Sequence, residues 1–84
     1  MKYHASVDIT LRQGILDVQG KTVEHALHSM DFGSISNVRI GKFVELQLDA
    51  TSVEEAHQTV KNACEKLIAN PIMEDFHITV TEVA

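Results

Sequence analysis

The feature that most constrains the fold is a long alternation of apolar and polar side chains over residues 37–49. The apolar side chains recur at every second position, with one interruption: Val38, Ile40, Val44, Leu46 and Leu48. A period of two predicts a β-strand with one buried face and one solvent-facing side. At roughly 3.3 Å per residue, an unbroken strand here would run about 40 Å, which exceeds an ordinary strand.

The interruption falls at Gly41 and Lys42, where Lys42 takes the apolar parity and Phe43 the polar one. A glycine inside a strand usually marks a bend, a bulge or the close approach of another backbone. We predict one long second strand that bends at Gly41. A hairpin at this point is the alternative, although the pair lacks the second positive-φ residue that a type I′ turn favours. A strand of this length cannot be covered by the rest of an 84-residue chain, so we expect an obligate oligomer.

The remaining pattern predicts a β-α-β-α-β order in a single domain over residues 1–84. The first and last strands show the same alternation, with Tyr3, Ala5, Val7, Ile9 and Leu11 facing inward in one and Phe76, Ile78 and Val80 in the other. We expect an α+β fold whose antiparallel sheet is covered on one face by two helices. The other face is polar, with Phe43 as its one large hydrophobe, and is a candidate docking surface.

Capping residues predict where the two helices begin and end. Asp17 is the expected N-cap of the first helix, and Gly33 is expected to supply the left-handed residue after it. Ser52 and Glu55 form a capping box before the second helix. The first helix carries an apolar stripe at helical spacing, made of Val23, Ala26, Leu27 and Met30.

Composition excludes several classes of function. Twelve acidic residues against seven basic ones give a net charge of −5, and the basic residues do not cluster, so a nucleic-acid partner is disfavoured. No apolar run approaches the ~18 residues of a membrane span. A single cysteine provides no disulfide framework, and the N-terminus enters the first strand without an apolar signal region. We therefore expect a cytoplasmic protein with no membrane partner.

Few side chains suggest chemistry of their own. His25 and His28 are the only histidine pair on one helix, and no further ligands complete a familiar metal set, so surface or subunit contact is the favoured interpretation. Cys64 lies on the apolar stripe of the second helix, which favours core packing over nucleophilic catalysis. Arg39 and Lys42 are the only basic residues of the long strand. They are either solvated strand charges or contacts to an acidic partner or a phosphate.

Several segments together resemble the PurS family over essentially the whole chain. The most specific are Val-Arg-Ile-Gly-Lys at residues 38–42 and Leu-Asp-Val-Gln-Gly at residues 16–20, supported by residues 26–30 and 64–71. The family usually has proline where this chain has Val18, so the first helical turn loses a residue preorganised for it.

The resemblance implies the small, non-catalytic subunit of phosphoribosylformylglycinamidine synthase. In that complex a glutaminase subunit, PurQ, releases ammonia, and a synthetase subunit, PurL, uses ATP and Mg; the small subunit binds no cofactor and holds the other two together. The resemblance also implies a fold related to ferredoxin-like domains, in dimers or dimers of dimers that exchange the first helix and second strand.

Two sets of residues are candidates for function within this scheme. The start of the first helix comprises Asp17, Gln19 and Gly20, and the candidate subunit contact or strand crossing comprises Arg39, Gly41, Lys42 and Phe43. A stand-alone ligand-sensing regulatory domain of ferredoxin-like type remains the alternative, because fold alone does not separate a sensor from an adaptor.

Overall fold

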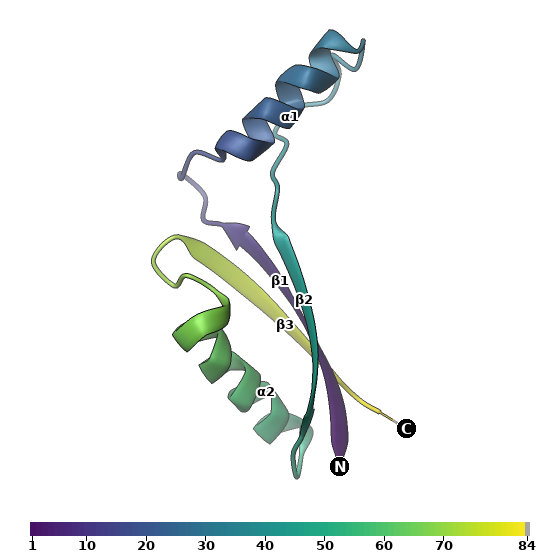
Figure 1. The fold of residues 1–84 in the computed structure, drawn as a ribbon, viewed down its shortest axis with the longest axis vertical. Coiled ribbons are helices and arrows are strands. Elements are labelled where there is room, and N and C mark those ends of the chain that lie inside the picture. The colour runs from purple at the N-terminus through teal and green to yellow at the C-terminus, as the bar shows by residue number, and fades with distance from the viewer. Residues whose placement is uncertain (84) are drawn as a thin grey trace.

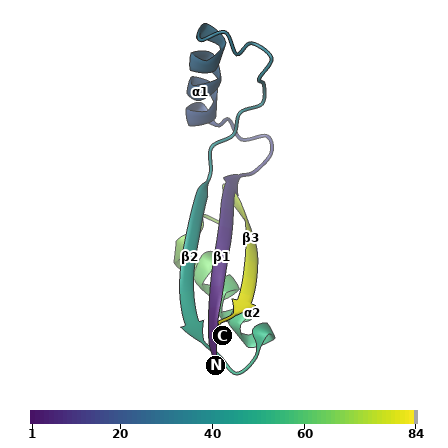
Figure 2. The ribbon, with the colours of Figure 1, turned by 90° about the vertical axis from the view of Figure 1, so that its right-hand side faces the viewer.

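The computed structural model describes residues 1–83 and confirms the α+β class and the predicted element order. The chain runs through β1 (Lys2–Leu11), α1 (Val18–Ser29), β2 (Lys42–Asp49), α2 (Val53–Ala63), a π-helical turn η1 (Cys64–Ile68) and β3 (Glu74–Glu82). The three strands form one antiparallel sheet in the order β2-β1-β3. The first strand of the sequence is therefore the central strand of the sheet (Figures 1 and 2).

The core lies between the sheet and α2. The inward side chains of β1 are almost completely buried, and they pack with Val60 and Cys64 from the second helical segment. Their partners on β2 and β3, including Leu46 and Ile78, are half-buried around this cluster. The alternation that predicted each strand thus marks the face that α2 covers.

The first helix does not cover the sheet, so that part of the prediction is wrong for the chain taken alone. α1 stands beyond the end of the strands on an arm formed by residues 12–41, while α2 alone packs against the sheet (Figures 1 and 2). The molecule consequently measures 51 × 29 × 14 Å. On the predicted apolar stripe of α1, Val23 and Leu27 are only half-buried and Met30 is 64% exposed. The stripe exists, but within this chain it has no sheet to pack on.

The second strand is shorter than predicted, because it begins at Lys42 rather than Asn37. Residues 37–41, the return segment, run back along α1 outside the sheet (Figure 1). The amides of Val38 and Ile40 donate to side-chain carboxylates on the arm instead of to a neighbouring strand. The chain passes Gly41 without reversing, so the hairpin alternative is wrong.

A second backbone passes close to Gly41, which is one of the three features that a glycine in a strand pattern can mark. A Cβ atom added there would lie 2.5 Å from the carbonyl oxygen of Ile9 and 3.0 Å from Cγ2 of Thr10. Only a residue without a side chain allows the return segment to pass β1 at this distance.

The helix caps agree with the sequence at both N-terminal ends, where Asp17 and Ser52 are the N-caps of α1 and α2. The prediction for Gly33 is wrong. Asp31 takes the left-handed conformation, with a φ of 71°, and the amides of Asp31 and Phe32 close a Schellman motif on the last turn of α1. Aspartate tolerates this conformation better than most residues, which lets the helix end before the glycine is reached.

Candidate functional site

The residues singled out from the sequence meet where the arm joins the sheet. Asp17, Gln19, Gly41 and Lys42 line a hollow of about 390 Å³ between the start of α1 and the end of the sheet. Arg39 lies around the corner, in a second hollow between α1 and the return segment. Phe43 is separate from this group, because it points to the face of the sheet that α2 leaves uncovered.

Asp17 joins the first turn of α1 to the return segment. Its Oδ1 accepts the amide of Gly20 at 2.8 Å, and its Oδ2 accepts the amide of Ile40 at 2.7 Å, so one buried carboxylate both caps α1 and binds the return segment. These bonds, led by that from Gly20, lower the pKa of the Asp17 carboxyl below its ordinary value, and the charge of Arg39 lowers it further. The carboxylate is therefore held in its ionised form.

Gly20 permits this arrangement. A Cβ atom at this position would lie 2.3 Å from the carbonyl oxygen of Val38, so any other residue would force α1 away from the return segment. Gln19 beside it is exposed and lines the hollow, and its backbone amide also contributes to lowering the pKa of the Asp17 carboxyl.

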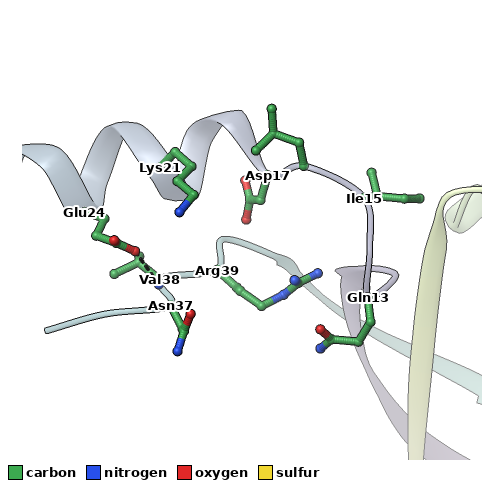
Figure 3. Close-up of a pocket in the computed structure, with 9 residues that line it drawn as sticks. Gln13, Ile15, Asp17, Lys21, Glu24, Asn37, Val38 and Arg39 are labelled. Atoms are coloured by element: carbon green, nitrogen blue, oxygen red, sulfur yellow. Dashed lines mark hydrogen bonds between the residues drawn. The ribbon is translucent and has the colours of Figure 1, made fainter.

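Glu24 repeats the contact of Asp17 two helical turns later, and the sequence reasoning missed it. Its Oε1 accepts the amide of Val38 at 3.1 Å, and this bond lowers the pKa of its carboxyl (Figure 3). Asp17, Lys21 and Glu24 follow one another at spacings of four and three residues along α1, so they share one face of the helix. That polar i, i+4, i+7 pattern, lying beside the apolar stripe, was the available signal.

Both basic residues of the predicted contact are engaged within the chain. The Arg39 guanidinium donates to the carbonyl oxygens of Leu11 and Arg12 at the end of β1, which fastens the return segment to the sheet. Lys42 Nζ lies 3.3 Å from Glu74 Oε2 across the same end of the sheet. A contact from either residue to a partner subunit stays a prediction.

The hollow between α1 and the return segment has a volume of about 400 Å³, and Lys21, Glu24, Asn37 and Arg39 are among the side chains that line it (Figure 3). Its two carboxylates, Asp17 and Glu24, already accept backbone amides, so they are held ionised rather than poised to exchange a proton. These two carboxylates therefore hold α1 against the return segment and so set the position of the arm; we call this pair of contacts the brace.

The other sequence-level candidates for chemistry are placed as follows. Cys64 is fully buried in the core, and burial raises the pKa of its thiol, which is the opposite of what a nucleophile requires. His28 contacts the carbonyl oxygen of Ile35 at 2.7 Å and so braces the far end of the arm. Within residues 1–83, metal-ligating side chains do not gather in groups of three, and the helices lack the length and apolar character to cross a bilayer.

Comparison with known proteins identifies the family. The PurS family model, described as phosphoribosylformylglycinamidine (FGAM) synthase, matches residues 4–82. The chain belongs to the PurS family. The PurS subunit of Bacillus subtilis phosphoribosylformylglycinamidine synthase is 42% identical over 81 residues, which cover 96% of this chain and 95% of that protein.

Solved PurS structures share the fold. A crystal form of the Bacillus subtilis PurS superposes with a TM-score of 0.84 at 42% identity, covering 95% of this chain and 99% of the other. A chain in the PurLQS structure from Thermotoga maritima superposes with a TM-score of 0.88 at 28% identity, covering 96% and 99%. PurS is a subunit of phosphoribosylformylglycinamidine synthase, a ligase complex, so the alternative of a stand-alone sensor is not favoured.

Proposed function

We propose that this chain is the non-catalytic small subunit that bridges the glutaminase subunit PurQ and the synthetase subunit PurL for the transfer of glutamine-derived ammonia. ATP and Mg act in the larger subunits, and the assembly works in the cytoplasm. The observation that carries the proposal is the similarity of nearly the whole chain to a chain of the PurLQS structure. The buried Cys64, with its raised pKa, agrees with a subunit that contributes no nucleophile.

The arm supports a homodimer, or a dimer of dimers, as the working unit. α1 has an apolar stripe without a surface to cover, and α2 packs on β1 and β3 while leaving the side chains of β2 half-buried. The outer edge of β2 is also free within the described residues. A second copy whose α1 and return segment lay over β2 would cover both, which is the exchange expected from the family.

The return segment is prepared for such pairing on one side only. Val38 and Ile40 direct their amides to the carboxylates of α1, and amides alternate in direction along an extended chain, so the intervening amide of Arg39 is expected on the opposite side. A partner strand would therefore pair with the side that α1 leaves open. Light scattering at micromolar concentration should give at least twice the 9.3 kDa chain mass. A folded monomer at that concentration would contradict the exchange.

Turnover with two nitrogen donors tests the bridging role. The chain alone should show no glutaminase, ATPase or ligase activity. Added to the synthetase and glutaminase subunits, it should be required for efficient glutamine-dependent amidine formation. Its effect should be much smaller with free ammonia, since added ammonia does not need the two active sites to be held together. Full glutamine-dependent turnover without this chain would refute the bridging role.

A further inference from the structure

The uncovered face of the sheet carries one exposed aromatic side chain in a polar setting. Phe43, near the start of β2, is 59% exposed and is the only exposed large hydrophobe within the three strands. It shares its face with Ser, Thr, His, Gln and acidic side chains, and α2 packs on the opposite side. The core therefore gives no reason for an aromatic residue at this position.

Two carboxylates neighbour Phe43 on this face of the sheet. The register places Asp8 of β1 directly opposite Phe43, and Glu45 follows two residues later on the same face of β2. Asp8 is exposed, and the Glu45 side chain is 61% exposed although its Oε2 lies 3.6 Å from Nε2 of His4 on the same face. His77 lies across from Asp8 on β3, and Arg12, just beyond the end of β1, pairs with Asp75 at 3.4 Å. The ring thus stands in a patch of negative charge.

This pattern does not suit a second copy of the chain. Two sheets that pack face to face need apolar inner faces, and this face offers one aromatic ring among polar side chains. Packing it on itself would also bring Asp8 and Glu45 towards their own copies, and opposed like charges disfavour association. A single aromatic anchor within a polar rim is instead typical of an interface between different proteins, where aromatic side chains carry much of the binding energy.

We propose that Phe43 is the anchor by which this chain docks on a larger subunit of the complex, in an apolar socket rimmed by Lys and Arg side chains. The inference rests on the proposed bridging function and names the surface that performs it. Asp8 and Glu45 supply the complementary charge, which steers association and fixes the orientation of the docked face. The α2 face and the arm remain available for the second copy.

The test measures binding of Phe43→Ala to the purified synthetase–glutaminase pair by titration, with circular dichroism to confirm the fold. We expect affinity to fall at least ~30-fold, the loss typical of a central aromatic anchor. Leu67→Ala is the matched control, because Leu67 is 87% exposed on η1, away from this face. It should bind as the unsubstituted chain does. Phe43→Tyr keeps the ring and should retain most of the affinity.

Charge reversal on the same face provides a second, independent test of the docking surface. Asp8→Lys should weaken binding and reduce its dependence on salt, whereas Glu65→Lys, an exposed reversal on η1, should change neither. Unchanged binding by Phe43→Ala would overturn the docking surface while leaving the bridging function intact. If Phe43→Ala changed the oligomeric mass of the isolated chain and left partner binding intact, the face would be assigned to contact with a second copy, which would also overturn the proposed docking surface. A required subunit whose unsubstituted form did not bind the pair would contradict the bridging function itself.

Discussion

Replacing Gly41 by alanine tests the close crossing of the return segment and β1. The added Cβ atom would lie 2.5 Å from the carbonyl oxygen of Ile9, and a carbon-to-oxygen contact normally lies at about 3.3 Å or more. One backbone must therefore move by about 0.8 Å. Overpacking of this kind costs about 1–3 kcal/mol, and the loss of chain entropy in the unfolded state returns about 0.4–1 kcal/mol. We expect a net destabilisation of about 1–2 kcal/mol.

Thermal unfolding at fixed protein concentration provides the assay, because association makes the midpoint depend on concentration. A domain of this size loses about 4–8 °C in Tm per kcal/mol, so Gly41→Ala should unfold about 4–16 °C lower. Gly33→Ala is the matched control, since a Cβ atom at Gly33 meets nothing within 4 Å and its φ is not positive. Its Tm should stay level or rise slightly. Equal midpoints for the two variants would refute the steric reasoning, and Gly41→Val should show a larger loss than Gly41→Ala.

Three further outcomes follow from the arm and the core. The carboxyl groups of Asp17 and Glu24 have lowered pKa values in the folded state. The stability that they contribute is therefore present above their unfolded-state pKa values, near pH 4, and is lost as the pH falls through the lower folded-state pKa values. Thermal unfolding at a series of acidic pH values should show a shallower fall in Tm for Glu24→Gln than for the unsubstituted chain. Ser52→Ala removes the cap bond to the Glu55 amide and should cost about 1 kcal/mol in urea unfolding. Cys64 should react with a thiol reagent only as fast as the protein opens, so its rate should rise with denaturant; rapid labelling of the native protein would contradict its burial.

The strands and the second helix were predictable because their signals are local. Tyr3, Ala5 and Val7 alternate in sequence and are buried in the sheet, and Ser52 caps α2 as its type and position predict. The start of β2 was misplaced because Val38 and Ile40 continue the alternation after the chain has left the sheet. An alternating pattern indicates an extended chain with one apolar and one polar side. Whether that chain is a strand of a sheet depends on whether another strand lies beside it.

The position of α1 was not predictable for a related reason. Its stripe was visible in Val23 and Leu27, but the helix does not pack on the sheet of its own chain. The role of Asp17 in holding the return segment was only partly predictable. Asp17 was recognised as a helix cap, but its second hydrogen bond, from the Ile40 amide, joins residues 23 positions apart. A side chain with one obvious local partner gives no sequence signal for a second, distant one.

The order β2-β1-β3 also sets when the sheet can form during synthesis. The central strand is the first to leave the ribosome, yet its neighbours begin at Lys42 and Glu74, and its pairing with β3 joins Tyr3 to Glu82. At about 5–20 residues per second, the last residues of β3 emerge about 4–14 s after Leu11. Until β2 emerges, β1 exposes both of its hydrogen-bonding edges and an apolar face, and the edge that pairs with β3 stays open for the whole interval. Its nearest complementary strands are then those of neighbouring nascent chains on the same message, so pairing between copies competes with closure of the sheet within each one.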